Sequence, residues 1–298
     1  MSEIRLSVLV PFYKDDPTPL IADMGRAIPL CELGVELVLY DDGTADETLT
    51  EKIENAIAKC GFPARLVTEK ANRGRAEARN ALVRAAKADK VLFLDADMRF
   101  PDDEFLSRWT SAIVDHDPDI AFGGFEAPDD ASAPQYRLHQ AFSRSAECAP
   151  AVVRAEDPAR HLYTSNLLVR KSVLAAQPFD AGFAGWGWED MEWAARAAHH
   201  FTILHIQNPA IHAGLETEEG LLDRYQNSGA NYARFVSLHP DIAARMPLYR
   251  WAKLLRRTPG QRACRPVLSR IVRAPAPVDV RVAALKLWRA SWYGDALP

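Results

Sequence analysis

The chain contains the stretch Val91-Leu92-Phe93-Leu94-Asp95-Ala96-Asp97, in which four apolar residues lead directly into two carboxylates. A short, uninterrupted apolar run is typical of a β-strand that is buried on both faces. Ligands of α/β proteins bind at the carboxyl ends of such strands. Because a lone carboxylate is costly to bury, we expect a cation to meet it there. The stretch therefore predicts that Asp97, with Asp95 beside it, holds a divalent metal and its accompanying phosphates.

The same acidic triplet also has an ordinary structural interpretation. Asp95 could cap the next helix, and Asp97 could be a solvated loop residue. Neither common phosphate loop, Gly-X-X-X-X-Gly-Lys-Ser/Thr or Gly-X-Gly-X-X-Gly, follows the first predicted strand. If phosphates bind here, a metal is therefore the obvious group to hold them.

Predicted strands and helices alternate on both sides of this stretch. Strands are predicted at 4–11, 35–40, 64–68, 91–95, 120–125, 162–169 and 201–206, and helices at 20–30, 46–58, 72–88, 103–115 and 191–200. Such alternation with short loops predicts parallel βαβ units. We expect residues 127–158 to be irregular, and the chain from residue 218 onward to be helical, interrupted by prolines.

Composition limits the class of protein. The 298 residues are 48% hydrophobic and 26% charged, which is ordinary for a globular protein of one large domain with an appendage. The four cysteines form no Cys-X-X-Cys pair, so neither a disulfide framework nor a zinc knuckle is expected. Since no apolar run reaches membrane-spanning length, we expect a cytoplasmic protein, or one bound to the inner face of the cytoplasmic membrane.

Charge is unevenly distributed along the chain. From Arg250 to the end there are eleven basic and two acidic residues, so this tail carries +9 and the rest −13. Residues 248–257 and 278–293 place Trp, Leu, Val and Arg at near-helical spacing. Such helices could dock on an anionic membrane, or pack on the main domain with their arginines solvated. Nucleic acid is not expected as a partner, because the main domain is acidic.

Five stretches carry a resemblance to a known family. They are Val8-Leu9-Val10-Pro11-Phe12-Tyr13, Asp41-Asp42-Gly43-Thr44-Ala45-Asp46-Glu47-Thr48, Asn72-Arg73-Gly74 with Ala78-Arg79-Asn80, Leu94-Asp95-Ala96-Asp97, and Gly185-Trp186-Gly187-Trp188-Glu189-Asp190. In this order they resemble the family 2 glycosyltransferases of the GT-A fold. The last stretch also resembles the acceptor motif of the β-1,4-galactosyltransferase and chondroitin-polymerase type.

The resemblance implies an α/β fold and a division of the chain. The expected architecture is a Rossmann-like, nucleotide-sugar-binding mixed sheet flanked by helices, with a basic helical extension at the C-terminus. Residues 1–215 would form the catalytic domain, with a nucleotide-binding half at 1–100 and an acceptor-binding half at 101–215. Residues 216–298 would form the extension.

The resemblance also implies roles for individual residues. Nucleotide binding would involve Pro11, Tyr13, Asp41, Asp42, Arg79 and Asp95, with Asn80 near the diphosphate or sugar. The metal ligands would be Asp97 and His212. Asp190 would be the general base, and Glu189, Trp186, Gly187 and Trp188 would shape the acceptor site.

Each of these residues also has a plainer interpretation. Asp42-Gly43 could be only a turn, and Tyr13 could fill the core. Arg79 could pair with Glu77, and His212 could be an ordinary polar loop residue. Should Asp190 not be the base, Glu192 on the next helical turn is the reserve candidate.

The implied activity is an inverting hexosyl transfer from a nucleotide-diphosphate sugar, with UDP-sugars expected from family frequency. Mn²⁺ or Mg²⁺ would offset the charge that develops on the leaving diphosphate. A carboxylate on the opposite side would take the proton of the attacking hydroxyl of a glycan or lipid-linked acceptor. The alternatives are a nucleotidyltransferase or a non-catalytic sugar-binding module of the same fold.

Two departures from the family patterns limit the resemblance. Trp188 stands where galactosyltransferase-like sequences carry a small residue, so their acceptor cannot be assumed. No Gln-X-X-Arg-Trp occurs, because Pro247 stands where the Gln would precede Arg250-Trp251. Single addition is therefore expected rather than processive polymer synthesis.

Overall fold

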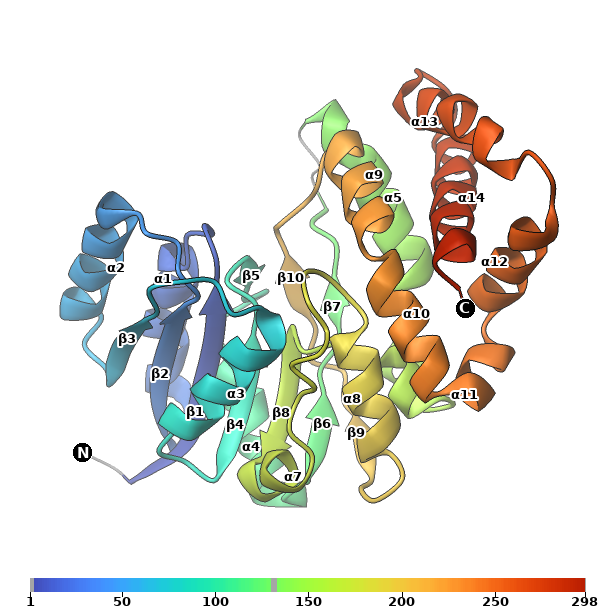
Figure 1. Cartoon of the computed structure of the whole chain (residues 1–298). Coiled ribbons are helices and arrows are strands. Elements are labelled where there is room, and N and C mark those ends of the chain that lie inside the picture. Colours follow the sequence, from blue (N-terminus) through green and yellow to red (C-terminus); the bar gives the residue numbers. More distant parts are fainter. Residues whose placement is uncertain (1–2, 130–132, 298) are drawn as a thin grey trace. The chain divides into compact units, whose positions relative to one another are not determined.

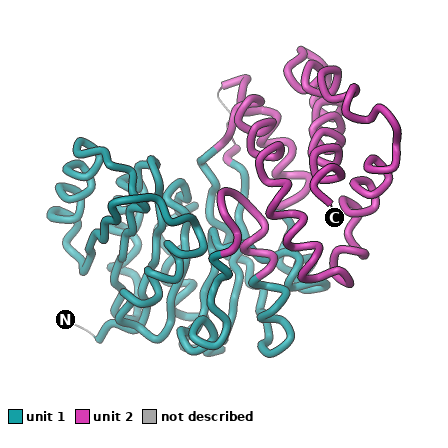
Figure 2. The backbone as a smooth tube through the Cα atoms, in the orientation of Figure 1, with its two compact units in different colours: residues 1–127, 148–181, 193–214 teal, residues 128–147, 182–192, 215–298 magenta. Residues whose placement is uncertain are grey.

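The computed structural model describes residues 3–129 and 133–297 and divides into two compact units (Figures 1 and 2). Unit 1 takes the chain up to Ala127, together with Cys148–Ala181 and Trp193–Gly214. Unit 2 takes 128–147, Gly182–Glu192 and the chain from Leu215. The boundary near residue 215 agrees with the predicted division, but two earlier segments join the C-terminal helices instead of the sheet.

Unit 1 is built on a seven-stranded sheet with the order β3-β2-β1-β4-β8-β6-β9. Its strands are β1 (Ile4–Phe12), β2 (Gly34–Asp41), β3 (Ala64–Thr68), β4 (Lys90–Leu94), β6 (Ile120–Phe122), β8 (Asn166–Arg170) and β9 (Ile203–His205). The first four strands are parallel, as predicted, whereas β8 runs antiparallel to both β4 and β6. The sheet is therefore mixed, in agreement with the expected fold class.

Helices cover both faces of this sheet. They are α1 (Thr18–Ala27), α2 (Glu47–Lys59), α3 (Arg75–Ala85), α4 (Phe105–His116), α6 (Ala151–Arg154), α7 (Lys171–Ala176) and the C-terminal part of α8 (Glu189–Ala197), with single 3₁₀ turns at Ile28–Leu30 and Pro158–His161. As predicted, Asp46 caps α2, since its carboxylate accepts a hydrogen bond from the N–H of Leu49. The fold thus places layers of helices on either side of one sheet.

The decisive apolar stretch lies at the centre of this arrangement. Leu92 and Leu94 point into the core beneath α1, α2 and α4, whereas Val91 and Phe93 point into the core beneath α3, α7 and α8. All four side chains are completely buried. The prediction that β4 is buried on both faces is confirmed.

A second, three-stranded sheet lies beside the ends of the larger one. It has the order β5-β10-β7 and consists of β5 (Met98–Arg99), β7 (Phe125–Glu126) and β10 (Ala210–His212). The sequence predicts a loop at the position of β10 and gives no sign of β5, since each strand is too short to show a periodic pattern. This small sheet matters because β5 follows Asp97 and β10 contains His212.

Unit 2 is helical. Its helices are α5 (Arg137–Ala146), α9 (Glu218–Asn227), α10 (Gly229–Leu238), α11 (Pro240–Arg245), α12 (Pro247–Arg257), α13 (Arg265–Arg273) and α14 (Val278–Ala296), with 3₁₀ turns at Pro134–Tyr136 and Gln261–Cys264. Prolines begin α11 and α12, which agrees with the predicted interruptions. Residues 127–158, predicted to be irregular, contain α5 and α6.

Helix α14 is the central element of unit 2. It packs against α5, α9, α10, α12 and α13, and buries Leu285 and Trp288 among their side chains. A Cβ at Gly294 would lie 2.6 Å from the carbonyl oxygen of Ala252, so these two helices approach closely. Much of the basic tail is thus a packed helical body. In the described part of the chain, every helix is too short or too polar to traverse a bilayer.

Candidate active site

The carboxyl ends of β1 and β2 bring two predicted stretches together in unit 1. Phe12 pairs with Asp41, and the N–H of Asp42 donates to the carbonyl of Phe12 at 2.9 Å. Pro11 lies within β1, and Tyr13 follows that strand with 42% of its surface exposed. Tyr13 is therefore not a core residue, and its ring is available for stacking.

Asp42 fastens the loop that precedes α3. Its two carboxylate oxygens accept hydrogen bonds from the N–H groups of Arg73, at 2.8 Å, and Gly74, at 2.9 Å. Burial, together with the charges of Asp41 and Glu69, raises the pKa of Asp42 despite these two donors. Asp42 is 4% exposed, and both of its carboxylate oxygens are used in holding this loop.

Gly43 allows the two loops to approach each other. Its φ of +81° favours glycine, and an added Cβ would lie 2.5 Å from the carbonyl carbon of Ala71. Asp41 supports the same turn, since its Oδ1 accepts a hydrogen bond from the N–H of Thr44 at 2.9 Å. The Asp41-Asp42-Gly43-Thr44 stretch is therefore a turn, in line with its plainer interpretation. The Asp42 carboxylate in addition joins this turn to the loop of Arg73 and Gly74.

Two arginines of α3 meet the first carboxylate of the Asp-X-Asp stretch. Arg75 Nη2 lies 3.4 Å from Asp95 Oδ2, and Arg79 Nη2 lies 3.5 Å from Asp95 Oδ1. Arg79 is 1% exposed, so its charge is held within the protein beside Asp95. Arg79 therefore pairs with Asp95 rather than with Glu77, which instead accepts from Arg84.

Asn80 takes a different position from the one expected. Its side-chain amide donates to the carbonyl of Phe179 at 2.9 Å, and its oxygen accepts from the N–H of Phe179 at 3.1 Å. Both ends of the amide are thus used to hold the segment that precedes residues 182–188, called the Gly/Trp loop below. Asn80 therefore has a structural role, and its predicted position near the diphosphate or sugar stays a prediction.

The two predicted metal ligands lie side by side. His212 Nε2 is 3.3 Å from Asp97 Oδ2. The short sheet brings them together, since His212 of β10 pairs with Met98 of β5 and the N–H of Ala213 donates to the carbonyl of Asp97 at 3.0 Å. Asp97 and His212 are 115 positions apart in the sequence, and the backbone pairing of only two residues in β5 with two in β10 makes them neighbours.

The surroundings of Asp97 are suited to a cation. Of the atoms in the described residues, none donates a hydrogen bond to Asp97 Oδ1, although this oxygen is shielded from solvent. Burial raises the pKa of Asp97, but the hydrogen bond and charge of His212 and the charge of Arg75 outweigh it and lower the pKa. Asp97 is therefore ionised and has one oxygen without a protein partner.

Gly214 completes this part of the site and was not found from the sequence. A Cβ at this position would lie 1.8 Å from Asp97 Oδ2, so only glycine leaves room for the carboxylate. The local signal was a glycine two residues after His212, but its contact with Asp97 depends on the pairing of β5 with β10. Arg75 was missed for a similar reason, because only Arg79 belonged to a matched stretch.

The other predicted residues belong to unit 2. Residues 182–188 form an irregular loop, with positive φ at Gly185, Gly187 and Trp188. The amide of Asn231 holds this loop by donating to the carbonyls of Ala184, at 2.9 Å, and Gly187, at 3.0 Å. A single side chain of α10 thus fixes the backbone of the loop.

The two tryptophans of the loop have different surroundings. Trp188 is 8% exposed, and its ring packs against Tyr232 and Phe235, at centroid distances of 4.8 and 5.1 Å. It belongs to the core of unit 2, and its predicted contact with an acceptor stays a prediction. Trp186 is half-buried, with the guanidinium of Arg224 4.7 Å from its ring.

The candidate base lies in the first turn of α8. Glu189 and Glu192 are 3% and 2% exposed, whereas Asp190 is half-buried and more accessible. Glu192 lies 3.5 Å from His239 Nε2. Carboxylates in a first helical turn are favoured by the helix dipole, so their presence here is also accounted for by the helix alone. Greater accessibility favours Asp190 over Glu192 for contact with an acceptor.

Comparison with known proteins extends this picture. The sequence profile described as glycosyl transferase family 2 matches residues 7–176. The dolichyl-phosphate beta-glucosyltransferase of Mus musculus is 29% identical over 118 residues, which is 37% of this chain and 36% of that protein. The chain therefore matches only about a third of the length of this curated relative.

Solved structures show the same fold. A mannosyltransferase from Pyrobaculum calidifontis, in complex with GDP-Man and Mn²⁺, has a TM-score of 0.57 at 16% identity, covering 98% of this chain and 85% of that one. S. aureus TarS has a TM-score of 0.51 at 16% identity, covering 98% and 90%. The glucosyl-3-phosphoglycerate synthase of Mycobacterium tuberculosis has a TM-score of 0.51 at 17% identity, covering 78% and 79%. Because the family profile matches more than half of the chain, this protein belongs to glycosyl transferase family 2 and is a glycosyltransferase of the GT-A fold.

Proposed function

We propose that the protein transfers one hexosyl group, with inversion, from a nucleoside-diphosphate sugar to a hydroxyl of a glycan or lipid-linked acceptor, and that it requires a divalent cation. The observation that carries this proposal is that Asp97, next to His212, has a solvent-shielded oxygen that receives no hydrogen bond from the residues described. UDP-sugars are the donors to test first. The Mn²⁺ in the solved mannosyltransferase supports testing that cation first.

Asp97 and His212 fit a Mn²⁺ or Mg²⁺ ion. Both metals accept carboxylate oxygen and imidazole nitrogen, and Mg²⁺ usually has only one or two protein carboxylates, with phosphates and water completing its shell. Among the described residues, no group of three or more His, Cys, Asp or Glu side chains is placed to hold a metal ion, so phosphates and water would have to complete the shell. The bound cation would offset the negative charge that develops on the leaving diphosphate.

Donor binding would use the loops at the ends of β1, β2 and β4. Tyr13 would stack on the base, and Asp42 would accept a hydrogen bond from it. Asp95 would bind the ribose or sugar, oriented by its contacts with Arg75 and Arg79. The positive charge of these two arginines would also favour the approach of a diphosphate.

Acceptor binding and proton removal would belong to residues of unit 2. Asp190 would accept the proton of the attacking hydroxyl, and Glu189 would support it at the start of α8. Trp186 and Gly187 would shape the acceptor site, as in the galactosyltransferase-type motif that this loop resembles. Since one base suffices for direct displacement, inversion at the anomeric carbon follows from this scheme.

The test combines donor binding with two substitutions. Thermal shift with UDP-, GDP- and dTDP-sugars and Mn²⁺ should raise the melting temperature for one class, because ligands of the folded state stabilise it. Asp97→Ala should remove the Mn²⁺-dependent part of that shift. Asp190→Asn should leave donor binding intact and lower transfer by about 10²–10⁴-fold.

Three results would contradict the proposal. Mn²⁺-independent transfer, or full activity of Asp97→Ala, would exclude the metal role. Retained transfer by Asp190→Asn would move the base to Glu189 or Glu192. Release of inorganic pyrophosphate from a nucleoside triphosphate, with no sugar transfer, would indicate a nucleotidyltransferase instead.

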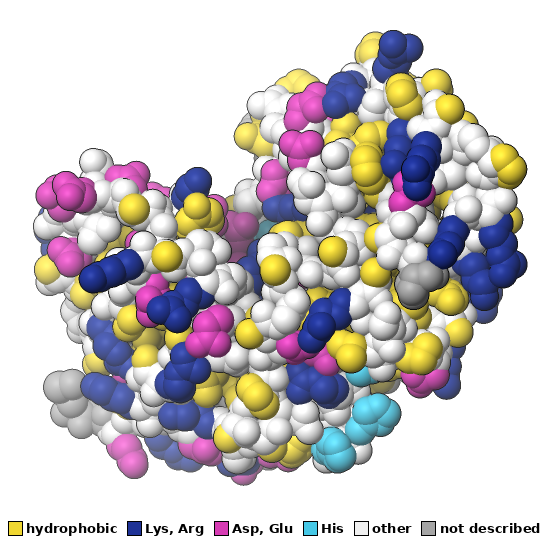
Figure 3. Space-filling model, in the orientation of Figure 1, with side chains coloured by type: hydrophobic (Ala, Val, Ile, Leu, Met, Phe, Trp, Pro, Cys, Tyr) yellow, Lys and Arg dark blue, Asp and Glu magenta, His cyan; other side chains and the backbone are white. Residues whose placement is uncertain are grey.

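We also propose that α12 docks this enzyme on an anionic membrane, at the inner face of the cytoplasmic membrane. Trp251 and Leu254 are 51% and 55% exposed on one face of α12, where Arg250, Lys253 and Arg257 are also exposed. Figure 3 shows Lys and Arg side chains, with hydrophobic ones between them, over the C-terminal helices. A basic helix with exposed Trp is suited to the membrane interface.

The packing of unit 2 decides how docking is tested. Removal of the tail would expose the core around α14, so point substitutions are preferable to truncation. Trp251→Ser with Leu254→Ser should reduce sedimentation with anionic vesicles, and Arg250→Glu with Arg257→Glu should reduce it further, at about 1 kcal/mol per charge. Val114→Ser, at an exposed position of α4, is the matched control. Equal sedimentation of all four proteins would exclude docking through α12.

A further inference from the structure

We propose that Asp23 is a positioning residue for Asp97 and His212, and that it acts through Arg99 and the pairing of β5 with β10. Asp23 belongs to α1, is 1% exposed, and lies outside the residues that the family resemblance implicates. The inference rests on the proposed metal role of Asp97 and His212, and it names a residue that controls how well they are held.

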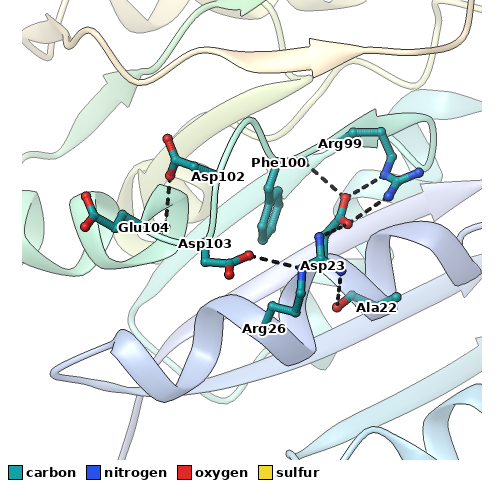
Figure 4. Close-up of polar contacts among 8 residues, drawn as sticks. All are labelled: Ala22, Asp23, Arg26, Arg99, Phe100, Asp102, Asp103 and Glu104. Carbon is teal, nitrogen blue, oxygen red and sulfur yellow. Dashed lines mark hydrogen bonds and ion pairs between the residues drawn. The ribbon is translucent and has the colours of Figure 1, made fainter.

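The carboxylate of Asp23 accepts two hydrogen bonds from the guanidinium of Arg99 (Figure 4). Arg99 Nε donates to Oδ2 at 2.6 Å and Nη2 donates to Oδ1 at 2.8 Å. A two-point contact between guanidinium and carboxylate fixes both the distance and the plane of the arginine. Since Arg99 is the second residue of β5, this contact fixes the strand that directly follows Asp97.

Two further donors complete the environment of Asp23. The N–H of Phe100 donates to Oδ2 at 3.2 Å, and Arg26 Nη2 donates to Oδ1 at 2.7 Å. Arg26 is in turn held by Asp103, whose Oδ1 accepts from Nε at 3.1 Å. The contacts to Arg99 and Phe100 join α1 to the end of β5 through both a side chain and the backbone (Figure 4).

The strand pair that carries the metal ligands needs such support. Strand β5 has two residues, and its pairing with β10 consists of Met98 with His212 and Arg99 with Ile211. A pairing this short has little stability of its own. Because Met98 lies between Asp97 and Arg99 and pairs with His212, a shift of β5 would change the separation of Asp97 and His212.

Glu36 provides a matched control for a purely structural effect. It is also a buried carboxylate of unit 1, 0% exposed, and it is held by Arg65, by Ser7 Oγ at 2.6 Å and by the N–H of Lys87 at 2.7 Å. Lys87 precedes β4, whereas Asp97 follows it, so Glu36 lies at the other end of the strands. Loss of Glu36 should destabilise the fold without affecting the metal ligands.

The test measures Mn²⁺ affinity of the full chain in the absence of donor and acceptor, by electron paramagnetic resonance of the free ion. Asp23→Asn and Arg99→Gln should each weaken Mn²⁺ binding by about tenfold, the scale typical of residues that support metal ligands. The double variant should bind Mn²⁺ no more weakly than Asp23→Asn, because Asp23→Asn already disrupts the contact that Arg99→Gln removes. The Mn²⁺ affinity of Glu36→Gln should remain within about twofold of that of the natural protein, although its melting temperature should fall by an amount comparable to that of Asp23→Asn.

The outcomes separate this inference from the proposed function. Unchanged Mn²⁺ affinity in Asp23→Asn, with weakened binding in Asp97→Ala, would overturn the role of Asp23 alone. An equal loss of Mn²⁺ affinity in Glu36→Gln would show that Asp23 acts only through overall stability, and would also overturn its positioning role. No Mn²⁺ binding by the natural protein would refute both the metal site and its positioning residue.

Discussion

The edge of unit 1 that carries Asp97 and His212, and the Gly/Trp loop of unit 2, hold their candidate residues in different ways. At the edge of unit 1, backbone pairing and ion pairs place Asp97, His212 and Asp95. In the loop of unit 2, the amide of Asn231 and the buried ring of Trp188 hold residues 182–188. Substitutions at the edge should therefore change ligand binding, whereas substitutions in the loop should first change stability.

The largest effect is expected from removal of the ring that anchors the loop. Trp188→Ala should lower the free energy of unfolding by about 3–5 kcal/mol, as for other large buried side chains replaced by alanine. The ring is surrounded by Tyr232, Phe235 and Tyr293, so the cavity cannot easily be refilled. Urea unfolding followed by circular dichroism measures this loss.

The neighbouring tryptophan provides the contrast. Trp186→Ala should cost only about 1 kcal/mol, mainly through loss of its contact with Arg224. It should raise the KM for the acceptor while leaving donor binding unchanged. A small stability loss in Trp188→Ala combined with a raised acceptor KM would show that Trp188, after all, contacts the acceptor.

At the edge of unit 1 the corresponding change is Gly214→Ala. Since the added Cβ would lie 1.8 Å from Asp97 Oδ2, the carboxylate must move away from His212. Mn²⁺-dependent transfer should fall by about a hundredfold, and Mn²⁺ affinity should fall with it. Stability should change little, because Asp97 contributes no hydrophobic packing.

Unit 2 offers a glycine that faces a carboxylate in the same way. A Cβ at Gly220 would lie 2.3 Å from Glu216 Oε2, but this flexible side chain can rotate away. Gly220→Ala should therefore leave Mn²⁺ affinity and transfer unchanged. Equal effects of the two substitutions would show that Gly214 has no special relation to the metal site.

Elements with a long periodic pattern were predictable from the sequence. The first four strands and the helices between them follow from alternating apolar and amphipathic segments, and Val91 to Leu94 indicated a strand buried on both faces. Helix α5 was missed because its apolar positions, Leu138 and Phe142, lie in a segment with many Pro, Ala and Asp residues. Their partners in α9 and α14 come from distant parts of the sequence.

The site was predictable where a motif named the residue, and not where a contact depended on pairing. Asp97 and His212 were selected by type and position, but their 3.3 Å separation follows from two residue pairs of β5 and β10. The roles of Gly214 and Asp23 depend on the same short strands. Trp188 belonged to a motif, yet its burial depends on α10 and α14, which the motif does not contain.

A smaller effect is expected on the pH dependence of stability, from a buried histidine of unit 1. His205 accepts a hydrogen bond from Arg154 Nε at 3.1 Å and donates to the carbonyl of Pro158 at 3.1 Å. Burial lowers the pKa of His205 to about 4, and the charge of Arg154 acts in the same direction. The unfolded chain therefore takes up a proton below pH 6.5 that the folded protein excludes down to about pH 4.

Stability of the natural protein should thus fall as the pH is lowered from 6.5 to about 4, by at most about 1.4 kcal/mol per pH unit. His205→Gln can keep both hydrogen bonds and should flatten this part of the profile. Burial also lowers the pKa of His161. The comparison is therefore made between His161→Gln and the double variant His161→Gln with His205→Gln, so that His161 contributes to neither profile. An unchanged slope in the variant that lacks both histidines would show that His205 is not the source of the pH dependence.

The smallest effect is expected at Gly185, where the loop of unit 2 requires an unusual backbone conformation but leaves space. Its φ is +76°, and no atom lies within 4 Å of an added Cβ. Gly185→Ala should therefore cost about 1 kcal/mol of stability, the penalty for a left-handed alanine, with no steric clash. Mn²⁺ and donor binding should be unchanged, since neither uses this loop.

If the loop instead adopts another conformation, Asn231 loses its carbonyl partners, and the acceptor KM rises while stability falls by more than the backbone penalty. Measuring both quantities in Gly185→Ala and Gly214→Ala therefore tests whether glycine serves backbone conformation in one unit and space for a carboxylate in the other.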